Sequence, residues 1–551
     1  MDTFLSYLRD QQIVSSELLD HVLLRSRESN RDFFAELLQS SFANEDVILK
    51  SLAEFLAIKF DYIDHATVDP KVFSELSLEL IQRYRILPLF KLGHVLFVAV
   101  TNPFQSGIFE ELSHSLELEL DVVLTNNHCF DKSLSLLLDG FEKTKVHHVD
   151  VFDSPEETLA SDESAVEIVD RIFNQAILVG ASDIHFEPFQ DVLNVRFRMD
   201  GLLKDMMTLP LSLHHSLMSR IKIMANLDIT EIRKPQDGRL MVSFQGRQVD
   251  FRVSTLMTIT GEKMVLRVLD RATAYNSLAS LGFQMDVLEL LDPLINSSSG
   301  VIIVCGPTGS GKTSTLYSML NQLNSSSRNI VTIEDPVEYK FQGLNQVAVN
   351  PELNMTFVSG LKTVLRQDPD VILVGEIRDF DTASVTLQAA MTGHLVFSTL
   401  HTRSAAASIT RFLDMGHKPF LLNSALLAVI GQRLLRCLCP KCKIKQATYD
   451  PLSTKEKRIM EMLLLEDSSV EFCVPVGCSQ CFNTGYRGRT GVFEVMVLNE
   501  HIRDQVQKKS SSEHIHQVAV DFGMKSILTD AFLKIKQGIT SLSEVARVLD
   551  F

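Results

Sequence analysis

The sequence predicts an α/β protein: a doubly wound, mostly parallel sheet domain with a phosphate-binding loop, preceded by α+β domains and followed by a zinc-binding and helical C-terminal region. Three observations support this fold class. Strand-like and helix-like runs alternate beyond about residue 280, a glycine-rich loop joins one strand to one helix, and two cysteine pairs follow. Such alternation is typical of a parallel sheet with helices on both faces.

The size and charge of the chain limit its organisation and its partners. At 551 residues it is too long for one hydrophobic core, so we expect three or four domains. The net charge of −16 argues against a broad nucleic-acid-binding surface, which needs clustered Lys and Arg.

The sequence also lacks the pattern of a membrane span or of a signal peptide. The most apolar helical pattern, Leu421–Ile430, is too short to cross a membrane, and the first residues do not resemble a signal peptide. We therefore expect a cytoplasmic protein that binds no nucleic acid and reaches membranes only through partners.

Hydrophobic patterning divides the chain into six expected parts. Val95–Val100 predicts a buried strand in the first part, and the second part is acidic with few apolar anchors. An amphipathic helix at Val166–Leu178 and alternating strands at 194–198 and 250–253 indicate a second α+β domain. The parts are an N-terminal helical and α+β domain (1–140), an acidic linker (141–163), an α+β domain (164–278), the phosphate-loop core (279–436), a tetracysteine zinc module (437–490) and a C-terminal helical region (491–551).

A glycine-rich loop gives the most specific chemical prediction. It follows an apolar run at 300–305 that predicts a buried strand, and it precedes the helical pattern Lys312–Leu323. The glycines let backbone N–H groups surround the phosphates of ATP, Lys312 adds a positive charge, and Thr313 offers a hydroxyl to Mg²⁺. The alternative is a glycine loop without a ligand, but the strand and helix favour a nucleotide site. The loop that fits GxxxxGK[ST] is Gly306-Pro307-Thr308-Gly309-Ser310-Gly311-Lys312-Thr313.

Two carboxylates are expected beside this loop. Glu376 ends the apolar strand at 371–374, and Glu334 ends the run at 330–333. Strand ends of this kind meet at the carboxyl edge of a parallel sheet, where phosphate-loop ligands bind. Glu376 can hold Mg²⁺ through water or polarise the attacking water, and Glu334 can orient water or metal. A surface acid after a core strand is the alternative for each.

Two histidines, His394 and His401, flank a further strand pattern at 395–400. One hypothesis is that both sense the γ-phosphate of ATP and couple it to domain motion. The alternative is that they are core or loop histidines with ordinary hydrogen bonds.

Six of the eight cysteines fall between residues 437 and 481, which in a cytosolic chain favours a metal site over disulfides. The pairs Cys439–Cys442 and Cys478–Cys481 each have CxxC spacing, and four thiolates suit a tetrahedral Zn²⁺. Cys437 and Cys473 lie just outside the pairs and are expected to be bystanders. Beyond them, Gly485–Gly491 predicts turns that lead into a strand.

Together these residues resemble the secretion ATPases of the type II and type IV pilus systems, over about residues 160–550. Beside the loop, the matching motifs are Thr332–Pro336, Leu365–Asp370, Thr392–Thr402 and Gln432–Leu434. The resemblance implies a RecA-like core in a homo-hexamer, with ATP held between the phosphate-loop domain and the preceding domain of the same chain. Arginines of that preceding domain reach the phosphates, and by motif position these are Arg252 and Arg267. The alternative for each is a surface arginine on a strand.

Within that family, the resemblance implies a type II secretion motor. Such a motor is cytoplasmic and peripheral at the inner membrane, uses ATP, Mg²⁺ and Zn²⁺, and drives pseudopilus assembly and protein export. Its implied partners are the cytoplasmic part of an inner-membrane secretion platform protein and a polytopic platform protein. Arg31-Asp32-Phe33 stands where relatives that bind cyclic di-GMP have Arg-Leu-Gly, so docking is the expected role of the N-terminal domain. The alternatives are a type IV pilus extension ATPase, a DNA-transport ATPase and a nucleotide-binding scaffold.

Overall fold

The structure is a computed structural model that describes most of the chain. The described residues are 33–39, 45–56, 58–64, 67–73, 76–92, 94–144, 164–244, 247–270, 277–446, 453–462, 472–478, 481 and 483–549, with scattered positions before residue 33. They form two compact units, one built mainly from residues 1–269 and one mainly from residues 270–551. Most of the expected acidic linker (145–163) and residues 31 and 32 lie outside the described residues.

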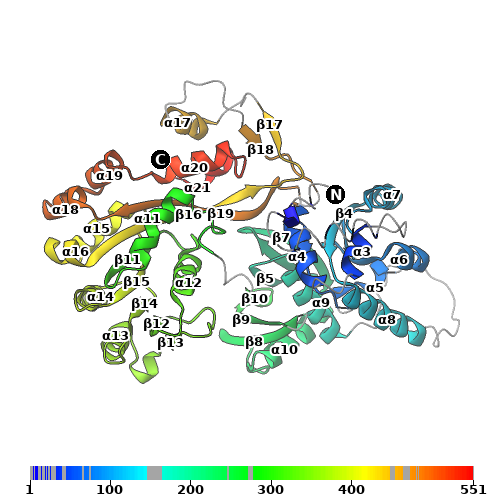
Figure 1. The fold of residues 1–551 in the computed structure, drawn as a ribbon. Helices are drawn as coiled ribbons and strands as arrows, with labels where there is room; N and C mark the ends of the chain where they lie inside the picture. Colours follow the sequence, from blue (N-terminus) through cyan, green and yellow to red (C-terminus); the bar gives the residue numbers. More distant parts are fainter. Residues whose placement is uncertain are drawn as a thin grey trace. The chain divides into compact units, whose positions relative to one another are not determined.

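The N-terminal part of the first unit is built on a four-stranded sheet in the order β1-β4-β3-β2. Its strand β4 and the helices α3 to α8 are labelled in Figure 1. Its third strand in the chain, β3, is buried throughout, which confirms the strand predicted at Val95–Val100. The strands are β1 (Lys59–Phe60), β2 (Ile86–Leu92), β3 (Val95–Val100) and β4 (Glu119–Leu124). The helices are α3 (Phe33–Gln39), α4 (Glu45–Leu56), α5 (Pro70–Phe73), α6 (Leu78–Tyr84), α7 (Ser106–Leu116) and α8 (Asn127–Thr144).

The rest of the first unit contains a six-stranded sheet in the order β7-β6-β5-β10-β9-β8. Helix α9 (Ala165–Leu178) begins with a capping box between Ser164 and Glu167, and its Phe173 stacks on Phe251 with ring centroids 4.9 Å apart. The helix predicted at Val166–Leu178 and the strands predicted at 194–198 and 250–253 are confirmed, because each lies within an observed helix or strand. The strands are β5 (Asp183–Pro188), β6 (Val192–Met199), β7 (Leu202–Pro210), β8 (Gln236–Phe244), β9 (Arg247–Thr258) and β10 (Gly261–Asp270), and a second helix is α10 (His214–Met224).

A seven-stranded sheet in the order β13-β12-β14-β15-β11-β16-β19 forms the centre of the second unit. Each pairing is parallel except that of β16 with β19. Alternate residues of β11 enter separate cores, Ile303 on one face and Ile302 on the other. The strands are β11 (Gly300–Cys305), β12 (Ile330–Glu334), β13 (Asn345–Ala348), β14 (Val371–Val374), β15 (Leu395–Leu400), β16 (Leu426–Leu438) and β19 (Tyr486–Val497).

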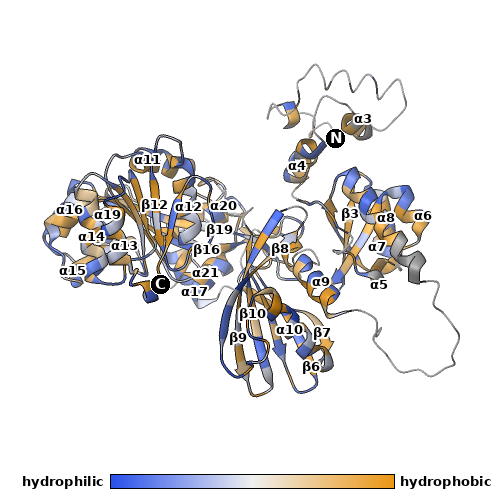
Figure 2. Ribbon diagram, turned by 90° about the horizontal axis from the view of Figure 1, so that it is seen from below, coloured by the Kyte–Doolittle hydropathy of each residue, from blue (hydrophilic) through white to orange (hydrophobic). Residues whose placement is uncertain are grey.

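Helices cover both faces of this sheet, as the sequence predicts for a doubly wound fold. The core on one face includes residues of α11 (Met285–Ile295) and α12 (Lys312–Leu323), and the other includes residues of α13 (Phe357–Val364), α14 (Phe380–Met391), α15 (Ala405–Asp414) and α16 (Pro419–Ala425). The central strands are largely hydrophobic, whereas the helices carry both kinds of residue (Figure 2). This pattern is the one that burial of a sheet between two helical layers requires.

Two local predictions in the C-terminal third were wrong. The apolar stretch Leu421–Ile430 is not one helix, because α16 ends at Ala425 and β16 begins at Leu426. Residues 486–491 of the predicted turns belong to β19, which pairs with β16 from Tyr486 onward. Strand β16 also passes the expected boundary at 436, so the sheet continues into the expected zinc module. Pairing between distant segments outweighs the local pattern at both places.

The remaining elements follow or interrupt this sheet. They are the paired strands β17 (Ile444–Gln446) and β18 (Phe472–Val474) and the helices α17 (Thr454–Met462), α18 (Glu500–Gln507), α19 (Ser512–Asp521), α20 (Ile527–Lys536) and α21 (Leu542–Val548). Within the residues that the structure describes, no helix combines the length and the apolar character needed to cross a membrane.

Candidate functional site

The glycine-rich loop lies at the carboxyl end of β11 and leads directly into α12. Cys305, the last residue of β11, pairs with Leu400 at the end of β15, so the loop starts at the carboxyl edge of the sheet. Gly311 precedes the first residue of α12 and has φ of 88°, a left-handed conformation that favours glycine. The loop and the N-terminus of α12 therefore have the local geometry that the sequence predicts for phosphate binding.

Lys312 folds back over the loop. Its Nζ donates to the carbonyl oxygens of Gly306 at 2.9 Å and Pro307 at 3.0 Å, and the residue is only 9% exposed. Burial lowers the pKa of Lys312, while Cys305 and Glu376 act to raise it. A bound phosphate is negatively charged, so like Glu376 it would raise the pKa of Lys312 and favour the charged ammonium. The ammonium is therefore held at the loop by neutral carbonyls that a phosphate group can replace.

Two hydroxyl groups of the loop face different surroundings. Thr313 is exposed in the first turn of α12, where an incoming ion can reach it. Ser310 is 3% exposed, and its Oγ makes no hydrogen bond to any described residue. Buried hydroxyl groups nearly always have a partner, so the Ser310 hydroxyl fits a loop that is completed by a ligand.

Glu376 lies at the same edge of the sheet, two residues beyond β14. Its two carboxylate oxygens contact different side chains: Oε1 pairs with the guanidinium of Arg378, and Oε2 lies 3.3 Å from Nε2 of His401. The carboxylate also acts on the pKa of Lys312, so the structure brings Lys312, Glu376 and His401 together. Sequence reasoning missed Arg378, although its position two residues after Glu376 could have indicated it.

Glu334, the last residue of β12, is buried in a hydrogen-bonded network. Its carboxylate accepts hydrogen bonds from Thr332 Oγ1 at 2.6 Å, from Gln346 Nε2 at 3.3 Å and from the hydroxyl of Tyr317. Burial raises the pKa of Glu334, and these hydrogen bonds act against the shift. Tyr317 belongs to α12, so Glu334 is linked to the helix that follows the loop. Sequence reasoning found Glu334 but missed Tyr317 and Gln346, which have no motif of their own.

His394 lies at the opposite edge of the sheet. It directly precedes β15, whose first residue pairs with Gly300 at the start of β11. Its Nδ1 lies 2.9 Å from the carbonyl oxygen of Ala389, and its own carbonyl accepts from the Gly300 amide at 3.1 Å. The structure therefore does not bring His394 to the phosphate loop of this chain.

The two predicted arginines belong to the first unit. Arg267, on β10, has a side chain that is 61% exposed, and its Nε lies 3.2 Å from Oδ1 of Asp183 on β5. Arg252, on β9, lies opposite Arg239 of β8 in the antiparallel register. Both residues belong to strands of the six-stranded sheet, and their expected contact with ATP stays a prediction.

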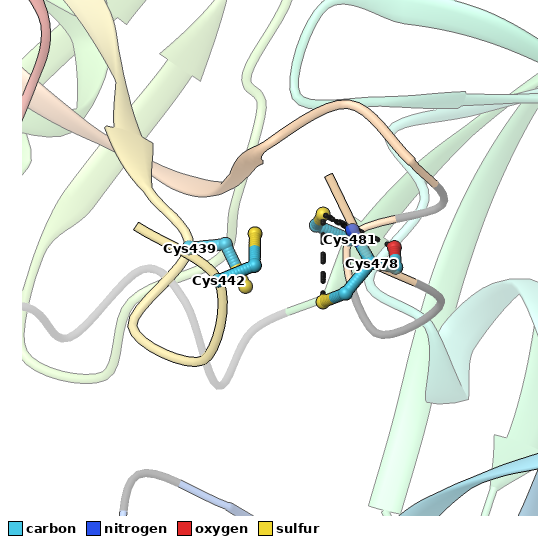
Figure 3. A group of neighbouring side chains, drawn as sticks. All are labelled: Cys439, Cys442, Cys478 and Cys481. Carbon is cyan, nitrogen blue, oxygen red and sulfur yellow. Dashed lines mark hydrogen bonds between the residues drawn. The ribbon is translucent and has the colours of Figure 1, made fainter. Parts of the chain in front are cut away.

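The four paired cysteines form one cluster. The Sγ atoms of Cys439, Cys442, Cys478 and Cys481 all lie within 4.8 Å of one another, and each pair comes from its own loop (Figure 3). The sulfurs of Cys478 and Cys481 are 3.8 Å apart. Tetrahedral Zn²⁺ with Zn–S bonds of about 2.3 Å needs sulfurs about 3.8 Å apart, so the donors fit this ion. Cys437 and Cys473 are not part of the cluster.

Comparisons with known proteins agree with this site. The profile of the family described as Type II/IV secretion system protein matches residues 158–547, and that of the MshEN domain matches residues 56–142. Type II secretion system protein E of Aeromonas hydrophila is 46% identical over 395 residues, which cover 71% of this chain and 77% of that protein. The type IV pilus assembly ATPase PilB of Acinetobacter baylyi is 36% identical over 569 residues, which cover 99% of this chain and 96% of that protein.

A solved structure supports the fold alone. The ATPase DotB of Legionella pneumophila has a TM-score of 0.52 at 20% sequence identity, over 70% of this chain and 96% of that chain. The family profile spans the six-stranded sheet, the phosphate loop, the strand-end carboxylates and the cysteine cluster. The chain therefore belongs to the family of type II/IV secretion system proteins.

Proposed function

We propose that this chain is the ATPase of a type II secretion system and that ATP hydrolysis drives pseudopilus assembly and protein export. The observation that carries the ATPase activity is the placement of Lys312 and the Glu376–His401 pair at one sheet edge. The secretion role is supported by relatives named for type II secretion at 46%, 45% and 43% identity.

In this proposal the residues of the loop bind ATP and Glu376 supports the attack of water. Lys312 exchanges the carbonyls of Gly306 and Pro307 for phosphate oxygens, and the loop amides and α12 add positive potential. Thr313 would hold Mg²⁺, which supplies charge neutralisation when bound. Glu376 accepts a proton from water or orients it, and His401 positions the carboxylate.

The first unit is proposed to contribute Arg252 and Arg267 to the phosphates of the same chain. A guanidinium can bridge two phosphate oxygens and offset the charge that develops during phosphoryl transfer. Arg267 contacts Asp183 in this structure, a carboxylate that can hold the side chain until phosphate binds. Loss of the γ-phosphate would then release the first unit, and this motion would do the mechanical work within a homo-hexamer.

The cysteine cluster is proposed to hold a structural Zn²⁺. Four thiolates close the coordination shell, so no position is left for water or substrate. The ion would join the loop after β16 to the loop before β19, because Cys439 and Cys478 lie in those segments.

The proposed location is the cytoplasmic side of the inner membrane, reached through partners. The proposed partners are the cytoplasmic part of an inner-membrane platform protein and a polytopic platform protein, with no nucleic acid. The N-terminal domain, which matches the MshEN profile, is the proposed docking part.

Pilus assembly is the second candidate, and one observation favours it. The PilB relatives align with 99% and 98% of this chain, whereas the first type II relative covers 71%. Deletion of the gene in the organism that encodes this chain separates the two functions. Loss of extracellular enzymes with normal pili supports secretion, and loss of surface pili with normal export supports the alternative.

The ATPase proposal is tested by turnover of purified full-length protein. Lys312→Ala should lose nucleotide affinity, and Glu376→Gln should bind ADP normally but lose about 10²–10⁴ in kcat. Glu352→Gln, an exposed acid after β13, is the matched control and should turn over like wild type. Equal phosphate release by wild type and both site variants, with platform protein and lipid present, would rule out the motor.

A further inference from the structure

One buried glutamine, Gln432, lies in the middle of β16, directly after the part of this strand that pairs with β11. In the parallel pairing of β11 with β16, Cys305 lies opposite Gly431, so Gln432 is the first residue of β16 beyond this pairing. On its other side it stays paired with Phe493 of β19, and its backbone oxygen lies beside Gly306. Only 2% of Gln432 is exposed. A polar side chain at such a position must find its hydrogen bonds within the protein.

The contacts of Gln432 extend from the first glycine of the loop to the last. Its backbone carbonyl oxygen lies close to Gly306: a Cβ added to Gly306 would be 2.6 Å from this oxygen. Its side-chain Nε2 lies close to Gly311: a Cβ added to Gly311 would be 2.8 Å from this nitrogen. Its Oε1 accepts a hydrogen bond from Thr315 Oγ1 at 2.8 Å, and Thr315 is fully buried in the first turn of α12. One residue therefore contacts both ends of the loop and the helix that follows it.

The next residue connects Gln432 with the catalytic carboxylate. Arg433 donates to the carbonyl oxygen of Gln432 at 2.9 Å and to that of Arg403 at 2.7 Å. Arg403 lies two residues after His401, whose ring contacts Glu376. The middle of β16 thus contacts both the phosphate loop and the segment that carries His401.

We propose that Gln432 is a positioning residue that fixes the phosphate loop and the first turn of α12 in the geometry that binds nucleotide. A neutral amide suits this place because it accepts from Thr315 through oxygen and turns its nitrogen toward Gly311. A carboxylate of the same shape would place a negative charge beside the phosphates, in a site where charges are poorly screened. The role rests on the ATP site proposed above and assigns a task to the Gln432–Leu434 motif.

Isosteric substitution at Gln432 tests this role in the full-length protein. Gln432→Glu should raise the Kd of ADP at pH 8 by about tenfold or more, with the same fall in kcat/KM for ATP. The midpoint of thermal unfolding should stay within a few degrees of wild type. Gln388→Glu, which makes the same change on the exposed face of α14, is the matched control and should bind ADP like wild type. Equal Kd values for the two variants would overturn the proposal.

The hydrogen bond to Thr315 is tested separately, and this arm keeps the proposal falsifiable if Gln432→Glu does not fold. Thr315→Val and Gln432→Met should each weaken ADP binding about threefold to tenfold, and the double variant should be no weaker than the worse single one. Thr315→Ser keeps the hydroxyl and should restore wild-type affinity. Additive losses, or a loss of thermal stability with an unchanged Kd, would show that the contact is only structural.

ADP affinity also separates this inference from the proposed function. If wild type releases no phosphate but its ADP affinity follows the expected order of variants, the motor proposal fails and the role of Gln432 stands. If turnover is normal and the variants bind ADP equally, the motor proposal stands and the role of Gln432 is wrong.

Discussion

Glu334 shows how a single buried carboxylate makes stability depend on pH. Three side chains donate to it, from Thr332, Gln346 and Tyr317, yet burial still raises its pKa above the ordinary 4.5. The folded chain therefore holds this proton more tightly than the unfolded chain does. Protonated Glu334 adds stability at low pH, and that stability is lost as the pH rises through the folded-state pKa.

The expected result is a pH-dependent difference between wild type and Glu334→Gln. The glutamine cannot ionise, so the free energy of unfolding of wild type should fall relative to the variant as the pH rises from 4.5 to neutral. The change should be about 1.4 kcal/mol per unit of pKa shift. Urea unfolding at several pH values measures it. Glu352→Gln, at an exposed position, should show no such trend, and a rise in relative wild-type stability with pH would contradict this account.

At the scale of elements, the sequence patterns predicted what is local. The helix Lys312–Leu323 and the strand Val371–Val374 have the predicted bounds, because the patterns that predict them are local. The helix follows the glycine loop and has apolar residues at helical spacing, and the strand is an uninterrupted apolar run. Strands β16 and β19 could not be predicted in this way. Their residues form strands because they pair with each other and with β11, and such pairing joins segments about fifty residues apart or more.

The same distinction between local patterns and distant contacts applies to the predicted site. Lys312, Glu376 and His401 belong to short motifs, and the structure brings them together. Arg378 and Gln432 lie in or beside such motifs, but their partners, Glu376 for Arg378 and Thr315 for Gln432, are seen only in the folded chain. His394 shares a motif with His401, but the strand between them places the two histidines at opposite edges of the sheet.

The packing of β16 against β19 allows a stability test. Glu494 of β19 is 2% exposed, and its Oε1 accepts from the amide of Ala405, the first residue of α15, at 2.7 Å. A Cβ on Gly431 would lie 2.6 Å from this carboxylate oxygen. Gly431→Ala should therefore lower the free energy of unfolding by about 1–3 kcal/mol, measured in urea. Gly107→Ala, where a Cβ meets nothing within 4 Å, is the control, and equal stability of the two variants would show that the contact adapts freely.

The cysteine cluster gives a second test at this scale, by removal of metal. Purified protein should contain about one zinc ion per chain, and Cys439→Ser or a strong chelator should remove it and lower the thermal midpoint. Cys437→Ser and Cys473→Ser should keep the ion, because neither sulfur belongs to the cluster. Elemental analysis decides the outcome. Loss of zinc from Cys437→Ser, or its retention in Cys439→Ser, would require a different set of ligands.

At the scale of the whole molecule, hydrolysis in the second unit must depend on the first if the chain is a motor. The phosphate loop, Glu376 and His401 all belong to the second unit, whereas Arg252 and Arg267 belong to the first. Residues of the first unit that only stabilise their own sheet would affect unfolding and leave kcat unchanged. Residues that reach the phosphates would change kcat without changing stability.

Arg267 separates these possibilities because it is exposed and Arg198 is a close analogue. Both arginines face Asp183, with Nε atoms 3.2 Å and 3.6 Å from its carboxylate oxygens, but only Arg267 matches the family motif. Arg267→Ala should reduce kcat by about a hundredfold or more, because phosphate charge loses a guanidinium partner. Arg267→Lys should recover part of the rate, since lysine keeps the charge but not the bidentate geometry. Arg198→Ala should hydrolyse ATP at the wild-type rate. If Arg198→Ala and Arg267→Ala were equally slow and equally unstable, the arginines would serve the sheet and not the nucleotide.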